Sequence, residues 1–177
     1  AKKVLVPAPH NKRLFANYCI TNNGPIECEE RDLPIDPYVF GAWLGDGTAR
    51  NRTITGLDVE IFDEIERRGI KISATSRSKT KYLGDVVDGR SVFNDTLKSL
   101  GVFGNKHIPD QYIFAAYQQR LDLLRGLMDT DGCCTKLGAC NFDNTNKAII
   151  DGIRILLFSL GIASTIQERR AVLYGKD

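Results

Sequence analysis

The stretch LRGLMDTDG, at residues 124–132, decides how this chain folds. It completes a predicted helix that begins near Gln119, because apolar residues recur along it at helical spacing. These apolar residues are Leu121, Leu124, Leu127 and Met128. Asp131 faces the negative end of the helix dipole, at a cost of roughly 0.3–1 kcal/mol, so its presence indicates a bound cation or another function. Gly132 suits the left-handed conformation that often follows a helix.

A second stretch, VFGAWLGDG at residues 39–47, repeats this pattern, with Asp36 as a predicted N-cap and Pro37 at the first helical position. In both stretches two small residues stand four apart before an Asp-Gly pair: Gly41 and Gly45 here, Gly126 and Thr130 in the other. A glycine inside a helix costs about 1 kcal/mol relative to alanine, which close approach of another backbone offsets. We therefore predict that the two helices pack together, so that Asp46 and Asp131 meet at one end.

Residues 124–132 resemble the LAGLIDADG signature of homing endonucleases, and residues 39–47 resemble a looser first copy. LGDG at residues 44–47 and NKHIP at residues 105–109 resemble the branch of this family carried inside inteins. The resemblance covers about residues 33–165. It implies an α+β fold, in which two pseudo-symmetric α-β-β-α-β-β-α units form a DNA-binding saddle. The purely structural alternative is that the two stretches are core helices with acidic C-terminal ends and no catalytic role.

Three parts are expected along the chain. Residues 1–32 form an N-terminal arm or a remnant of an adjoining intein segment, with a DNA-contacting segment and a plain packing strand as alternatives. Residues 33–116 form the first unit and residues 117–177 the second. Fewer residues follow Gly132 than separate the two motif aspartates, so the second unit is expected to be shortened or incomplete. The splicing halves of the intein are expected to be absent or to lie outside this sequence.

Further helices are predicted at residues 58–68, 91–100 and 144–160. Each ends in a glycine followed by an apolar residue, which is typical of the Schellman motif: Gly69, Gly101 and Gly161. Asp58 is expected to cap the first of these helices, with Val59, Ile61 and Ile65 facing inward. Strands are predicted at residues 4–6, 17–21, 70–73, 77–81, 82–87 and 163–173, with a strand pair at 133–142.

Basic residues are expected along the DNA. Side chains alternate along a strand, so Arg77, Lys79 and Lys81 would share one face and repel one another without an anion opposite; a solvated edge strand is the alternative. The full set of DNA-binding candidates is Arg50, Arg52, Arg77, Lys79, Lys81, Lys136, Arg169 and Arg170. Phosphate contacts would supply salt-dependent affinity, and strands in the major groove would read base edges.

The resemblance implies that Asp46 and Asp131 hold divalent cations, Mg²⁺ or another such as Mn²⁺, at a site shared with Gly45 and Thr130. Mg²⁺ prefers oxygen ligands and retains waters, and each aspartate would serve one DNA strand. Only the eighth motif position is acidic in both copies, which favours Asp131 over Asp129.

Two lysines complete the predicted catalytic set. Lys106 resembles the lysine that intein endonucleases place beside their metals, where it would polarise water or neutralise developing charge; a surface lysine is the alternative. Lys176, near the end of the chain, is the candidate for the equivalent lysine of the second unit.

The expected function is site-specific double-strand cleavage of DNA by the endonuclease portion of an intein. The protein would act as a monomer on a long pseudo-symmetric target, with the host protein of the intein as a second partner. The alternative is a nucleic-acid-binding protein of the same fold that does not cut: a maturase, a regulator or a degenerate endonuclease.

The bulk composition is ordinary for a soluble globule, with 42% hydrophobic and 26% charged residues. A net charge of +2 does not by itself indicate a nucleic-acid binder. Five cysteines without a C-x-x-C pair argue against a disulfide framework or a zinc site and favour a reducing cytoplasm. The sequence contains no apolar run of membrane-spanning length and no visible signal peptide, so no membrane partner is expected.

Overall fold

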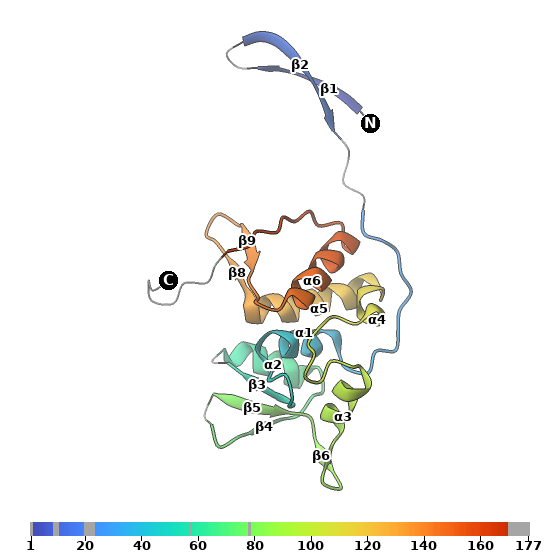
Figure 1. The fold of residues 1–177 in the computed structure, drawn as a ribbon, viewed down its shortest axis with the longest axis vertical. Coiled ribbons are helices and arrows are strands. Elements are labelled where there is room, and N and C mark those ends of the chain that lie inside the picture. Colours follow the sequence, from blue (N-terminus) through green and yellow to red (C-terminus); the bar gives the residue numbers. More distant parts are fainter. Residues whose placement is uncertain (1, 9–10, 20–23, 57, 78, 170–177) are drawn as a thin grey trace.

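The computed structural model describes residues 2–8, 11–19, 24–56, 58–77 and 79–169. Within these ranges helices alternate with small antiparallel sheets, which confirms the α+β class (Figure 1). The helices are α1 (Pro37–Asp46), α2 (Val59–Arg67), α3 (Val92–Ser99), α4 (Asp110–Ile113), α5 (Tyr117–Asp131) and α6 (Lys147–Ser159). The strands are β1 (Lys2–Ala8), β2 (Asn11–Cys19), β3 (Thr53–Thr55), β4 (Ile72–Ala74), β5 (Thr80–Leu83), β6 (Val86–Val87), β7 (Arg90–Ser91), β8 (Gly132–Cys134) and β9 (Cys140–Phe142). The pseudo-symmetric layout and the three-part division remain predictions.

Helices α1 and α5, the two motif helices, lie against each other through their backbones, as predicted (Figure 1). A Cβ atom at Gly41 would lie 2.3 Å from the backbone oxygen of Leu123, and one at Gly126 would lie 2.1 Å from that of Tyr38. Real Cβ atoms essentially never approach other atoms so closely, so only glycine fits at either position. Further along, Gly45 faces Thr130, so the two helices run in parallel and their C-termini lie together.

The two motif helices end in extended glycines. Gly47 has φ −74° and Gly132 has φ −91°, so the left-handed conformation predicted for Gly132 is wrong. Glycine is required here for a different reason. A Cβ atom at Gly132 would lie 2.4 Å from the carbonyl oxygen of Met128, and one at Gly47 would lie 2.3 Å from that of Trp43. The chain therefore leaves each helix by folding closely over its last turn.

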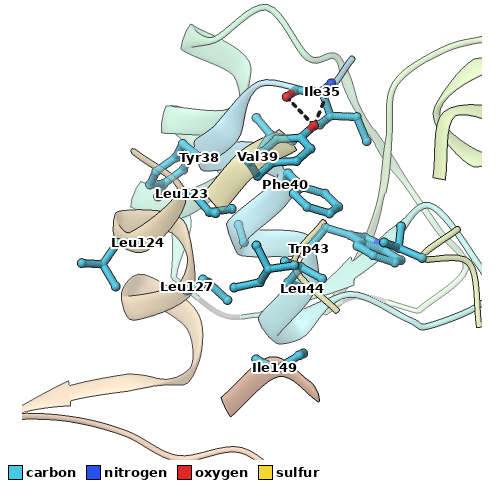
Figure 2. Close-up of a cluster of buried hydrophobic side chains, with 14 of the residues drawn as sticks. Ile35, Tyr38, Val39, Phe40, Trp43, Leu44, Leu123, Leu124, Leu127 and Ile149 are labelled. Carbon is cyan, nitrogen blue, oxygen red and sulfur yellow. Dashed lines mark hydrogen bonds between the residues drawn. The ribbon is translucent and has the colours of Figure 1, made fainter. Parts of the chain in front are cut away.

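The hydrophobic core gathers around α1, which is buried along nearly its whole length (Figure 2). The ring of Phe40 lies 4.4 Å from that of Tyr112 and 6.2 Å from that of Trp43, measured between centroids. The Tyr112 hydroxyl donates to the carbonyl oxygen of Ile35 at 2.9 Å and accepts from its amide at 3.2 Å, so the buried hydroxyl is satisfied. Asp36 caps the helix by accepting from two amides of its first turn, as predicted.

Strands β3, β5 and β4 form a three-stranded antiparallel sheet in that order. The strand predicted at residues 77–81 begins only at Thr80, so Arg77 and Lys79 lie in the turn between β4 and β5 and do not share a strand face. The physical reason is a competing local bond: the amide of Arg77 donates to the Thr75 hydroxyl at 3.0 Å, which favours a turn over a ladder.

Lys81 lies in β5 directly across from the buried Ile54, on the same strand face as the buried Leu83. This face of the sheet packs toward the helices, so the predicted common face for the three cations is wrong. The partner strand predicted at residues 82–87 is also wrong, because Gly84, at φ 70°, ends β5 before β6 begins. Strand β6 pairs with β7 instead.

Helices α2, α3 and α6 all end in Schellman motifs, as predicted. Gly69, Gly101 and Gly161 have φ of 84°, 71° and 76°. The apolar residue after each glycine donates its amide to a carbonyl five positions earlier, which is the defining bond of the motif. At the start of α2 the expectation is wrong in part: Asp58 makes no side-chain cap bond, and Val59 is 62% exposed. A residue at the first position of a short helix can turn outward while Ile61 and Ile65 remain buried.

The second half contains the predicted hairpin, formed by β8 and β9, and the predicted helix α6. The strand predicted at residues 163–173 is wrong where the structure describes it, because residues 163–169 form no strand. Their side chains are exposed and no neighbouring strand pairs with them, so their backbone has no ladder to join. Residues 170–173 lie outside the described part of the chain.

Strands β1 and β2 form an antiparallel hairpin that includes the strand predicted at 4–6 and the described part of the strand predicted at 17–21, and it lies apart from the helices (Figure 1). Residues 20 and 21 lie outside the described residues. The segment from residue 24 to residue 32 connects toward α1 and is anchored by Arg120, which is fully buried. The Arg120 guanidinium donates to the carbonyl oxygens of Ile26 and Ser159, the latter at 2.6 Å at the C-terminal end of α6. None of the helices in the described ranges has the length and apolar composition needed to cross a lipid bilayer.

The backbone contact predicts the effect of adding a single methyl group to Gly126. Gly126→Ala should lower the free energy of unfolding by about 1–3 kcal/mol, because the new Cβ overlaps the Tyr38 carbonyl and forces the helices apart. Urea denaturation measures this change. The matched control is Gly24→Ala, where a Cβ meets nothing within 4 Å, so the free energy of unfolding should stay unchanged. A stabilisation of up to about 1 kcal/mol by Gly126→Ala, as helix propensity alone predicts, would show that the helices do not touch.

Candidate metal and nucleic-acid site

Asp46 and Asp131 lie together at the C-terminal ends of α1 and α5, as predicted. Burial raises the pKa of Asp46, the negative charge of Asp131 raises it further, and the positive charge of Lys106 opposes both effects. A third carboxylate, Asp58, adds to the negative potential. The site therefore concentrates negative charge in a partly desolvated position, an arrangement that a bound cation would relieve.

Gly45 and Thr130, the other two predicted members of the site, form the contact beneath the carboxylates. A Cβ atom at Gly45 would lie 2.1 Å from the Thr130 hydroxyl oxygen and 3.5 Å from the carboxyl carbon of Asp131. The Thr130 hydroxyl donates back to its own helix, at 3.0 Å from the carbonyl oxygens of Gly126 and Leu127. These residues thus allow the helix ends to approach, and that approach sets the distance between the carboxylates.

Lys106 reaches the same place from the loop before α4. Its ammonium group donates to the carbonyl oxygens of Leu44 at 2.9 Å, Gly45 at 3.1 Å and Gly47 at 2.5 Å. It also lies 5.0 Å from the centroid of the Trp43 ring. Burial lowers the pKa of Lys106 to about 8, although both aspartates act to raise it. The alternative of a free surface lysine is therefore wrong: Lys106 caps the C-terminus of α1 and offsets the dipole that opposes Asp46.

Two asparagines, missed from sequence, connect α6 to this site. The Asn144 side-chain amide donates to Oδ2 of Asp131 at 2.7 Å. Asn146 caps α6 through the amide of Ala148 and donates its own side-chain amide to the carbonyl oxygen of Lys106 at 2.8 Å. The helix N-cap at Asn146 has a readable local signal, but its bond to Lys106 spans 40 residues and has none. Together the two asparagines orient Asp131 and hold the loop that carries Lys106.

Asp129 lies away from this centre. Its Oδ2 accepts a hydrogen bond of 2.8 Å from the Tyr38 hydroxyl. Burial, and then this bond, raise the pKa of Tyr38 well above its usual range. Asp129 also borders a groove of about 660 Å³ whose lining includes Asp58, Arg68 and Arg125. This placement supports the eighth motif position, Asp131, as the cation ligand.

The residues at the centre fit Mg²⁺ better than a softer metal. In the part of the chain that the structure describes, no group of three His, Cys, Asp or Glu residues is placed to enclose an ion. Mg²⁺ is usually bound through one or two carboxylates, with waters and substrate phosphates completing its coordination. Asp46 and Asp131 supply that number of carboxylates.

The sheet β3–β5–β4 presents a polar face opposite the core. The hydroxyls of Thr55 and Thr80 lie 3.1 Å apart across it, and Tyr82 follows on the same face. Arg52 stacks on the Tyr82 ring, 4.7 Å from its centroid, and donates to the carbonyl oxygen of Leu83 at 3.0 Å. Arg52 thus stabilises the sheet with the group predicted to contact DNA.

The remaining predicted DNA contacts are dispersed. Arg50, Arg77, Lys79 and Lys136 are exposed in turns, Lys136 at the tip of the hairpin β8–β9 as predicted. Arg169 is exposed and donates to the Gln167 side chain at 2.8 Å. Arg170 and Lys176 lie outside the described residues.

The partly buried carboxylate pair predicts a gain in stability when one charge is removed. Because the folded state raises the pKa of Asp46, the folded protein loses stability as the pH rises above the ordinary value of 3.8. Asp46→Asn should therefore unfold at a higher temperature than the wild type at pH 7 in metal-free buffer, with the difference vanishing near pH ~3. Thermal melts across this range measure it. The control Asp63→Asn, at an exposed position on α2, should melt like the wild type.

Comparison with known proteins gives two matches. Residues 118–176 match the family model described as a LAGLIDADG-like domain. The chain is also 34% identical over 154 residues to a replicative DNA helicase DnaB of Mycobacterium intracellulare. That alignment covers 87% of this chain, which spans only 24% of the length of the helicase.

Proposed function

The chain is a LAGLIDADG homing-endonuclease-type protein, and from this premise we propose that it cuts both strands of a specific DNA site in a metal-dependent reaction. The observation that carries the proposal is the pair of carboxylates, Asp46 and Asp131, at the adjoining ends of two parallel helices. Burial, and then the negative charge of Asp131, raise the pKa of Asp46, so a bound cation would stabilise the pair.

In this proposal Asp46 and Asp131 hold Mg²⁺, or another divalent cation such as Mn²⁺. A metal held there would supply an activated water and positive charge to offset the charge that develops on the phosphodiester oxygens. Asn144 keeps one oxygen of Asp131 occupied and so orients the carboxylate. Lys106 fixes the last turn of α1 and brings positive charge near the phosphate.

DNA would lie along the polar face of the sheet β3–β5–β4. Hydroxyl groups on that face would form hydrogen bonds with base edges, which present both donors and acceptors in the major groove. Arg77 and Lys79, in the turn between β4 and β5, suit phosphates, and Lys136 plays the same part at the tip of β8–β9. We propose a monomer acting on a long, pseudo-symmetric site.

The match to part of a DnaB helicase supports an intein origin, with the chain as the endonuclease portion of an insertion in a host protein of replicative-helicase type. The host is then the second partner of this segment.

Removing either carboxylate should stop double-strand cleavage. Asp46→Asn and Asp131→Asn should each abolish it in Mg²⁺ while DNA affinity changes less than about tenfold, or about 1.4 kcal/mol. The control Asp129→Asn should still cut, because that carboxylate bonds to Tyr38. Gel assays on DNA sites selected from a random library separate cut, nicked and intact products. Cleavage at the wild-type rate by Asp46→Asn or Asp131→Asn would refute the metal assignment, and binding without cleavage by the wild type would indicate a non-cutting regulator or maturase.

The turn between β4 and β5 should control the salt dependence of binding. Replacing both Arg77 and Lys79 with Ser should lower the slope of log affinity against log salt by roughly 1.8, because each phosphate contact contributes about 0.9. The matched control is Lys81→Ser, since Lys81 lies on the helix-facing side of the sheet and should leave the slope unchanged. An unchanged slope for the double variant would show that the turn is solvated when DNA is bound.

A further inference from the structure

The hairpin β8–β9 places two cysteine side chains against each other in space. Cys134 in β8 lies directly across from Cys140 in β9, and their sulfur atoms are 2.7 Å apart. Both thiols are free and exposed. Cys133 is also exposed, but as the neighbour of Cys134 in the strand it projects from the opposite face.

The backbone of the hairpin already has the geometry that a disulfide requires. Thr135 donates its amide to the carbonyl of Ala139 at 2.8 Å, which makes this a hydrogen-bonded pair. Such pairs alternate along an antiparallel ladder, so Cys134 and Cys140 form a non-hydrogen-bonded pair. Residues in such pairs have Cα atoms about 4.5 Å apart, within the range of about 4.4–6.8 Å found for disulfides. A bond between the two sulfurs therefore needs no backbone movement.

This hairpin is connected to the proposed metal site at its base and to the proposed DNA surface at its tip. Strand β8 begins directly after Asp131, and the amide of Asp143 donates to the Asp131 carbonyl at 3.4 Å where β9 ends. At the tip, beyond the cysteine pair, Lys136 is exposed and the side chain of Leu137 is 98% exposed. A covalent link between the strands would restrict the tip relative to the base.

We propose that Cys134 and Cys140 form a reversible disulfide, and that the hairpin is a modification site for thiol–disulfide exchange which tightens DNA binding when oxidised. The thiolate of one cysteine attacks a small-molecule disulfide such as oxidised glutathione, releasing one glutathione thiol and leaving a mixed disulfide. The thiolate of the other cysteine attacks the protein sulfur of that mixed disulfide and releases the second glutathione thiol. Two protein thiols are oxidised to one disulfide, and one glutathione disulfide is reduced to two thiols.

The bond itself is independent of the function of the chain, whereas its effect on DNA rests on the proposed function. Fixing the hairpin removes motion that the tip would otherwise lose on contacting DNA, so the oxidised form is pre-organised for binding.

Peptide mapping tests the bond. The full chain is equilibrated with a reduced and oxidised glutathione buffer, its remaining thiols are alkylated, and it is digested with trypsin and analysed by mass spectrometry without reduction. Cleavage after Lys136 separates the two cysteines, so the disulfide appears as a cross-link between two peptides. The cross-link is expected in the wild type and in Cys133→Ser, and is expected to be lost in Cys134→Ser and in Cys140→Ser. A wild type that carries only mixed disulfides with glutathione, or a cross-link that persists in Cys134→Ser through Cys133, overturns the proposal.

DNA dissociation tests the effect. The oxidised wild type should leave its DNA site at least threefold more slowly than the reduced wild type, and the Cys134→Ser variant should not respond to oxidation. Equal dissociation rates with the cross-link present overturn the effect and leave the proposed function intact. A reduced wild type with no affinity for DNA refutes the proposed function and leaves the mapping result standing.

Discussion

The contact of two helix backbones is the constraint on which this structure depends. At Gly41 and Gly126 each helix occupies the space where a side chain of the other would lie, with 2.1–2.3 Å between a would-be Cβ and the facing carbonyl oxygen. Helix axes are usually separated by 8–10 Å through the side chains between them. Here the usual spacers are absent at the crossing, so the relative position of α1 and α5 is set by main-chain atoms with little freedom to adjust.

That rigidity explains how a chain can hold two carboxylates close together in a partly buried position. Carboxylates on flexible loops would separate to relieve their repulsion. Asp46 and Asp131 cannot, because each ends a helix whose position is fixed by the crossing. Lys106 and Asn144 then compensate locally, the first at the carbonyls of α1 and the second at one oxygen of Asp131. The packing of α1 against α5 thus offsets the unfavourable free energy of holding the two carboxylates close together.

The parts of this arrangement that could be predicted from sequence are those with a local or repeated signal. The small residues at four-residue spacing predicted the helix contact, and glycine followed by an apolar residue predicted three helix ends. Strand boundaries were harder to predict from the sequence. A start three residues later than expected moved Arg77 and Lys79 into a turn, and pairing with Ile54 turned Lys81 toward the helices. A shift in register changes which face every side chain occupies.

The partners of the site residues could not be predicted for a different reason. The bond of Lys106 to the end of α1 spans 62 residues, and the bond of Arg120 to Ile26 spans 94. Both depend on loops that reach across the fold, and neither loop has a period that would place its side chains. The LAGLIDADG resemblance indicated a lysine near the metals, but it did not indicate that the lysine would be engaged with three carbonyl groups.

The anchoring of residues 24–32 by Arg120 has a consequence for how this molecule tolerates change. Arg120 lies near the start of α5 and Asp131 at its end, a separation of about 16 Å along the helix at about 1.5 Å per residue. The polypeptide that precedes α1 is thus fastened at the end of the helix remote from the carboxylates. Substitutions or insertions before residue 24 can therefore accumulate without displacing the carboxylate pair at the other end of α5.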